Sequence, residues 1–332
     1  MSARVRISLG LAVATGAAAA LFIVDDAYLM RIATLGAIFA ILALGLNLTA
    51  GHLGLFDFGY ILYFGIGGYT TALLTLRAGW SWEAALVASV LMSVAVGLLV
   101  GVVVLRLRGP YFVIATFSFL TVAYYVAINW KEVTNGPLGL IGLPAPAFNL
   151  PAIGRVEALD PAGALAIALT GLLIAVAVVW RVVESGAGRA WHAIRDNEDL
   201  AASVGIDATA YAFLALAVSA GLGGLGGSIY AGYVGIVTPE IFAFGHMVNV
   251  LLMVVIGGTG TFLGPIVGAF LVETVPELLR VAESFRLPIF GLLLIAAILF
   301  APQGVVSLRP WRALRAGRPR VPPVPPVEEG PA

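Results

Sequence analysis

The amino-acid sequence predicts an all-α polytopic membrane protein with roughly 8–10 transmembrane or re-entrant helices. Of its 332 residues, 61% are hydrophobic and only 11% are charged. The mean hydropathy of +1.03 leaves too little charge to cover the surface of a soluble protein of this length. Uncharged runs such as 85–105, 109–130 and 162–180 are each long enough to cross a hydrocarbon core of ~30 Å. Backbone groups in lipid must be satisfied internally, so the spans are expected to be helices.

Ten apolar segments follow one another along the chain, at 7–24, 30–50, 58–76, 84–105, 111–129, 161–180, 209–232, 245–257, 261–276 and 287–302. The shorter ones are candidates for re-entrant segments rather than full crossings. The first segment follows Arg4 and Arg6 and resembles a signal peptide. Because many more spans follow, an uncleaved first span is the favoured interpretation.

The distribution of basic residues predicts the orientation in the membrane. If Arg4 and Arg6 are cytoplasmic, an even number of crossings places the C-terminal tail on the same side. Twelve basic residues then lie inside and six outside, in line with the positive-inside rule. Without the five arginines of the tail, seven basic residues lie inside and six outside, so the tail contributes most of the excess of positive charge on the inside. We expect both termini to be cytoplasmic.

This orientation divides the chain into a transmembrane domain, 1–308, and a basic, proline-rich cytoplasmic tail, 309–332. An external loop at about 131–160 contains the stretch NGPLGLIGLPAPAFNLP, whose glycines and prolines predict an ordered, non-helical cap. A cytoplasmic loop occupies about 184–208. The tail has the composition of a disordered or polyproline-like segment, and a dispensable end is favoured there over a partner-binding motif.

The cytoplasmic loop concentrates charge in the stretch GRAWHAIRDNEDLAASVGI, which begins at Gly188. It predicts two short helices, one at about 189–195 and one at 198–204. Asp196 or Asn197 would cap the second helix, and Gly205 would take the left-handed position after it. A plain solvated connector is the alternative, but it has no need of caps, of the small residues at 201–203 or of Trp191.

Two glycine-rich stretches, 45–74 and 245–273, interrupt helical runs. They form a weak internal repeat: each has a Phe-Gly step, at 58–59 and 244–245, and a later glycine pair, at 67–68 and 257–258. Broken helices in the two halves of a chain are typical of a translocation route. Tight helix packing explains the glycines equally well. If the stretches line a route, the candidate wall residues are Asn47, Gly65, Gly67, Thr70, Asn249, Gly257, Gly258 and Thr259.

Several enzymatic and binding functions are disfavoured. There is no cysteine, and the three histidines lack metal-ligand spacing, so we expect no metal site. The only lysine, Lys131, is not part of a phosphate-binding P-loop, and no nucleophile elbow occurs. The G-x-G-x-x-G pattern at 221–226 lies inside an uncharged run, where packing is a better explanation than a dinucleotide. The net charge of zero gives no indication of nucleic-acid binding.

Three separated stretches resemble a known family in the same order: RGPYFVIATFSFLTVAYYVAINWKEVTNGPLGLIGLP, GRAWHAIRDNEDLAASVGI and VLLMVVIGGTGTFLGPIVGA. They are similar to the M-type permease subunits of branched-chain amino acid ABC importers, over about residues 33–304. The family's usual Ser-Leu-Gly-His step is replaced here by the residues at 57–60, Asp-Phe-Gly-Tyr. The resemblance implies the ABC importer permease architecture and a location in the cytoplasmic (inner) membrane of a bacterium or archaeon.

The resemblance also implies partners. A paralogous permease subunit would complete the pathway as a heterodimer, two cytoplasmic ATPase subunits would hydrolyse ATP, and an extracytoplasmic binding protein would deliver substrate. The chain itself would be no enzyme and would bind no cofactor. Its cytoplasmic loop loosely matches the family's E-A-A-x-x-x-G pattern at 199–205. The residues expected to couple it to the ATPase are Arg189, Trp191, Arg195, Asp199, Ala201, Ala202 and Gly205.

The substrate implied by the resemblance is a branched-chain, aliphatic amino acid. Urea, short amides or another amino acid within the same family are alternatives. So is a stand-alone secondary carrier, although such a carrier usually needs a deeper acidic residue than Asp57 or Glu273. A non-transporting membrane scaffold is a further alternative from another class.

Overall fold

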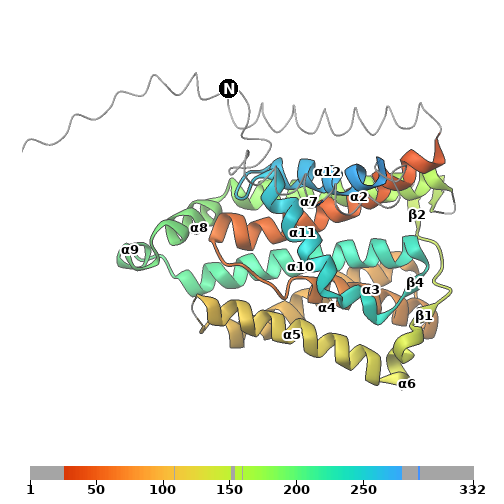
Figure 1. Ribbon diagram of the computed structural model, residues 1–332, viewed down its shortest axis with the longest axis horizontal. Coiled ribbons are helices and arrows are strands. Elements are labelled where there is room, and N and C mark those ends of the chain that lie inside the picture. Colours follow the sequence, from red (N-terminus) through yellow and green to blue (C-terminus); the bar gives the residue numbers. More distant parts are fainter. Residues whose placement is uncertain (1–25, 108, 151–153, 159, 279–290, 292–332) are drawn as a thin grey trace, which may run out of the picture.

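The computed structural model describes residues 26–107, 109–150, 154–158, 160–278 and 291 (Figure 1). The predicted segment 7–24, the tail 309–332 and, apart from residue 291, the predicted segment 287–302 lie outside the described residues. The other eight predicted apolar segments lie within them, and all eight are helical.

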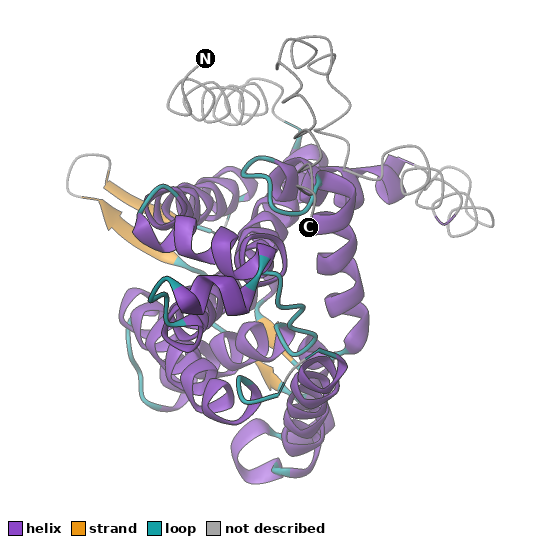
Figure 2. Cartoon of the chain, turned by 90° about the vertical axis from the view of Figure 1, so that its left-hand side faces the viewer, coloured by secondary structure: helices purple, strands orange, loops and turns teal. Residues whose placement is uncertain are grey.

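The long helices run side by side as one bundle, which Figure 2 shows in end view. Helix α2 (Ala27–Leu46) continues directly into the π-helix η1 (Asn47–Leu53). The others are α3 (Ile61–Arg77), α4 (Trp82–Val104), α5 (Pro110–Asn129), α7 (Pro161–Val183), α10 (Ala208–Val234), α11 (Phe244–Gly257) and α12 (Gly264–Leu278). Within the part of the chain that the structure describes, five units are long and apolar enough to cross a membrane: α2 with η1, α4, α5, α7 and α10. Helices α3, α11 and α12 are shorter, with 17, 14 and 15 residues.

Local chemistry fixes several helix ends. The side chain of Asp26 accepts a hydrogen bond from the Tyr28 amide at 2.9 Å, and Asp207 accepts one from the Ala210 amide at 3.0 Å. Each bond satisfies an amide that has no partner within its own helix. Helix α10 ends at Gly235, whose φ of 75° belongs to the left-handed region that glycine adopts without strain.

Glycines allow α10 to pack closely on its neighbours in the bundle. A Cβ atom on Gly67 of α3 would lie only 2.6 Å from the Cα of Gly224, so this crossing excludes any side chain at position 67. The glycines of the G-x-G-x-x-G pattern also face neighbouring helices: Gly223 lies on Tyr63 and Gly226 on Leu42. The pattern serves helix packing here, as the sequence predicted.

Short elements cover one end of the bundle (Figure 1). They are α6 (Lys131–Thr134), η2 (Gly136–Leu138), β1 (Leu140–Ile141), β2 (Ala147–Leu150) and β3 (Gly154–Glu157). Strand β1 pairs antiparallel with β4 (Ile236–Val237), placing Leu140 opposite Val237, and β2 pairs antiparallel with β3. Residues 239–242 form the 3₁₀-helix η3 (Pro239–Phe242).

The prediction of a non-helical external loop was wrong for its first part, because residues 131–134 and 136–138 form α6 and η2. The Thr134 hydroxyl stabilises this turn, since its single proton is shared between the Ala127 carbonyl at 2.7 Å and the Trp130 carbonyl at 2.8 Å. Helices α8 (Gly186–Asp196) and α9 (Glu198–Ser203) lie at the opposite end of the bundle (Figure 1).

Candidate functional site

The two short helices predicted for the cytoplasmic loop are present as α8 and α9. Helix α8 begins earlier than predicted because Ser185 caps it, accepting a hydrogen bond from the Ala187 amide at 3.1 Å. Of the two candidates for the second cap, Asn197 is the one used: its Oδ1 accepts from the Leu200 amide at 2.9 Å. Gly205 has a φ of 86°, so the left-handed position predicted after α9 is confirmed.

Trp191 attaches this helix pair to the transmembrane bundle. Its side chain is fully buried, and its indole Nε1 donates to the Tyr211 carbonyl of α10 at 2.8 Å. Ala201 of α9 is also buried. These two residues of the predicted coupling set therefore face this chain itself, where they fix the orientation of α8 and α9.

The outer surface of the helix pair is uncovered. Arg189, Asp199, Ala202 and Gly205, the other coupling candidates apart from Arg195, are exposed there. Two large apolar side chains lie among them: Leu200 of α9 is 65% exposed, and Val204, directly after α9, is 71% exposed. A polar helix pair with an apolar tip is suited to insertion into a groove of another protein.

Arg195 is also exposed, but its guanidinium reaches back to the bundle. Its guanidinium Nη1 donates to the Gly51 carbonyl of the π-helix η1. One turn earlier on α8, the ring of His192 lies against that of His52, with ring centroids 5.3 Å apart and Nε2 3.5 Å from Nδ1 of His52. Helix α8 therefore contacts η1 at two consecutive turns, a contact that the charge pattern of the sequence did not predict.

Asn47 joins the two glycine-rich stretches. It is buried, its Nδ2 donates to the Thr261 carbonyl at 2.9 Å, and its Oδ1 accepts from the Gly260 amide at 2.8 Å. Both ends of the amide thus bind the loop between α11 and α12. Sequence reasoning selected Asn47 but not its partners, since nothing in the local pattern marks a contact across more than two hundred residues.

The other predicted wall residues fall into two groups. Gly65, Gly67 and Gly257 lie against the Phe242 ring, Gly224 and Gly264 respectively. Gly258 is also buried, whereas Thr70 is half-buried and Asn249 and Thr259 are exposed. Close contact between helices explains why glycine occupies the closely packed positions in this conformation. Asn249 and Thr259 remain accessible to other molecules.

The two Phe-Gly steps of the internal repeat meet in space. The ring of Phe58 stacks on that of Phe244 with centroids 6.5 Å apart, and Phe117 of α5 meets Phe244 edge-on at 5.2 Å. Phe117, Phe244, Val248 and Asn249 are all exposed in this chain. We call these four residues the α5–α11 face. It combines apolar side chains with one amide, a composition that suits an aliphatic molecule with a polar end.

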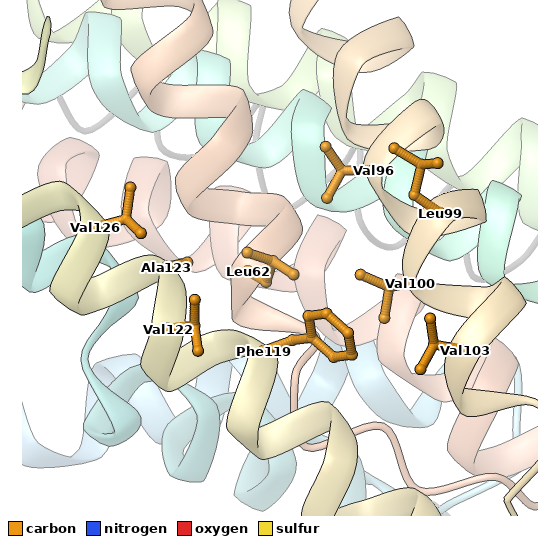
Figure 3. Close-up of a pocket in the computed structure, with 9 residues that line it drawn as sticks. All are labelled: Leu62, Val96, Leu99, Val100, Val103, Phe119, Val122, Ala123 and Val126. Atoms are coloured by element: carbon orange, nitrogen blue, oxygen red, sulfur yellow. The ribbon is translucent and has the colours of Figure 1, made fainter. Parts of the chain in front are cut away.

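A separate groove of about 290 Å³ lies between α4 and α5, over Leu62 of α3 (Figure 3). The nine side chains that line it are all apolar, Val100 and Phe119 among them. They offer no partner for the ammonium or carboxylate of an amino acid, which would lose its hydration without compensation. This groove is therefore a poor candidate for substrate binding.

Comparison with known proteins identifies the family of this chain. Residues 28–302 match the protein family described as branched-chain amino acid transport system / permease component. The chain is 33% identical over 306 residues to the high-affinity branched-chain amino acid transport system permease protein LivM of Salmonella typhimurium, covering 86% of this chain and 72% of that protein. LivM of Escherichia coli is 32% identical over 305 residues, with the same coverage.

A more distant relative carries a different name. The autoinducer 2 import system permease protein LsrC of Salmonella typhi is 26% identical over 236 residues, covering 68% of this chain and 64% of that protein. No solved structure matches the chain.

Proposed function

This chain belongs to the family of branched-chain amino acid transport system permease components, and we propose that it carries branched-chain amino acids inward across the membrane as one subunit of an ATP-driven importer. It is a multi-pass membrane protein, and we place it in the cytoplasmic membrane with both termini inside. The positive-inside count supports this orientation.

The observation that carries the proposal is the exposed apolar tip of the α8–α9 pair. Leu200 and Val204 are mostly exposed on a helix pair that Trp191 holds against α10. Such side chains gain stability when a partner removes them from water. A cytoplasmic ATPase subunit with a groove for α9 fits this need, and the sequence has no P-loop with which the chain could hydrolyse ATP itself. Two such ATPases would serve the two permease subunits, and this chain would bind no cofactor.

The α5–α11 face is our candidate for the surface shared with a paralogous permease subunit and for one wall of the pathway. Phe117, Phe244 and Val248 supply apolar surface for an aliphatic side chain, and Asn249 supplies hydrogen bonds. The cap built from α6, η2 and the paired strands β1 and β4 lies at the other end of the bundle from α8–α9 (Figure 1). There it suits docking of an extracytoplasmic binding protein.

The substrate distinguishes this proposal from its alternatives. LivM is named for branched-chain amino acids and LsrC for autoinducer 2, so import of urea, amides or another amino acid is the alternative within the family. A secondary carrier working alone is the alternative from another class.

The test is purification of the tagged chain from its native membrane, followed by reconstitution into liposomes. We expect two P-loop ATPases and a second permease to co-purify, and we expect uptake of labelled leucine, isoleucine or valine that requires ATP and the binding protein. Uptake by the single chain without ATP would overturn the proposal. Uptake of a different solute by the intact complex would keep the class and change the substrate.

A further inference from the structure

We propose that Arg195 is a positioning residue that transmits the movement of α8 to both glycine-rich stretches at once. Force from the ATPase would pass from α8 through the Arg195 guanidinium to η1, and through Asn47 to the loop between α11 and α12. The inference rests on the proposed function and adds to it the route by which ATP hydrolysis reaches the candidate pathway.

The first observation is that three elements meet at the Arg195 guanidinium. Nη1 donates to the Gly51 carbonyl of η1. A Cβ atom on Gly260, in the α11–α12 loop, would lie 2.9 Å from this same Nη1 and 2.9 Å from the Gly51 oxygen. A Cβ atom on Gly54 would lie 3.1 Å from the Arg195 Cγ. Helix α8 therefore touches η1 and the α11–α12 loop through one side chain.

The second observation concerns η1 itself. A π-helix of seven residues with every residue buried is rare, and such segments occur preferentially at functional sites. Gly51 lies in its last turn, where carbonyl groups lack partners within the helix. A buried carbonyl without a partner is costly, and Arg195 supplies the hydrogen bond. The irregular backbone of η1 is thus completed by a side chain from the cytoplasmic helix pair.

The third observation is that the connection continues beyond η1. Asn47, at the first position of η1, binds Gly260 and Thr261 with both ends of its amide. The contact between His192 and His52 lies beside this path. A displacement of α8 that left η1 in place would break the hydrogen bond to the buried Gly51 carbonyl, and a displacement of η1 that left the α11–α12 loop in place would break the two hydrogen bonds of the buried Asn47 amide.

The decisive experiment separates ATP hydrolysis from transport. The complete complex is reconstituted with Arg195→Met, with Arg195→Lys, or with the control Arg106→Met, which removes another exposed cytoplasmic arginine outside α8 and α9. We expect Arg195→Met to lower uptake per ATP hydrolysed by about tenfold, within the usual range of coupling energies. Arg195→Lys, which keeps one charged donor, should restore most of the loss, and Arg106→Met should behave as wild type.

Kinetics distinguish transmission from substrate contact. A broken transmission lowers the maximal uptake rate and leaves the half-saturating substrate concentration unchanged. Asn47→Leu removes the hydrogen bonds between η1 and the α11–α12 loop and should likewise lower the maximal uptake rate. Either variant therefore tests the transmission if the other does not assemble. A raised half-saturating concentration with an unchanged maximal rate would place Asn47 in the substrate wall instead and contradict its role in transmission.

A substrate-free measurement provides an independent test. The chain has no cysteine, so spin labels on Asp196→Cys of α8 and Thr259→Cys of the α11–α12 loop report one distance. We expect this distance to stay constant between nucleotide-free and ATP-bound complexes, and to change on ATP binding once Arg195→Met is added. If ATP binding changes the distance between the two labels by the same amount with and without Arg195, the inference is refuted. Failure of the wild-type complex to import branched-chain amino acids would instead count against the proposed function.

Discussion

Replacing Trp191 by alanine should detach the α8–α9 pair from the bundle. The side chain is fully buried, and its Nε1 donates to the Tyr211 carbonyl at 2.8 Å. Truncating a buried tryptophan to alanine costs about 3–5 kcal/mol. Trp191→Phe keeps the aromatic body and removes the donor, which costs about 1 kcal/mol for the lost hydrogen bond. The helix pair lies outside the spanning segments, so water is the appropriate reference for both figures.

Hydrogen–deuterium exchange of the α8 amides measures this local opening directly. Because each 1.4 kcal/mol corresponds to a factor of ten, protection should fall by about 10²- to 4 × 10³-fold in Trp191→Ala and by about fivefold in Trp191→Phe. Trp80→Ala removes a half-exposed tryptophan at the opposite end of the bundle and should leave α8 unchanged. Unchanged protection of α8 in Trp191→Ala, or an equal loss in α4 and α5, would refute the role of Trp191 as a local anchor.

Three further outcomes are expected. Gly67→Val should lower the thermal unfolding temperature of the purified chain, because even a Cβ would lie 2.6 Å from the Gly224 Cα; an unchanged unfolding temperature would contradict the close crossing. Asn197→Ala should raise exchange of the α9 amides by an amount equivalent to about 1 kcal/mol, whereas Asn197→Asp keeps the cap and the protection. Replacing both Leu200 and Val204 by serine should leave the unfolding temperature unchanged while reducing recovery of the ATPases, and full recovery would show that the apolar tip is not the docking surface.

The positions of the spans could be predicted from the sequence because lipid leaves helices as the only solution for an apolar run. The predicted segments 84–105 and 111–129 correspond to α4 and α5 within two residues at each end. The continuation of α2 into a π-helix could not be predicted. Hydropathy is the same for α- and π-helical turns, and the contacts of Asn47 and of the Gly51 carbonyl come from residues far away in the sequence.

The α8–α9 pair was predictable because capping is local chemistry. Asn197 and Gly205 reveal the ends of α9 through their own backbone requirements. The direction of each side chain was not predictable. A tryptophan on a polar helix can face a partner or its own bundle, and only the position of the Tyr211 carbonyl settles the matter for Trp191. The same holds for Arg195, which reaches back to η1.

The internal repeat can be interpreted physically from two of the places where its copies touch. The Phe58 and Phe244 rings stack at the Phe-Gly steps, and Asn47 binds Gly260 and Thr261 at the other contact. Stacked rings can slide past each other at little cost in free energy, whereas both ends of the Asn47 amide form hydrogen bonds with the loop that such a movement would break. If these stretches line the proposed pathway, a rearrangement that opens it is expected to cost less free energy at the aromatic contact than at Asn47. In the proposed transmission, Arg195 acts on η1 beside Asn47, so the two stretches are expected to move together at that end and to separate at Phe58 and Phe244.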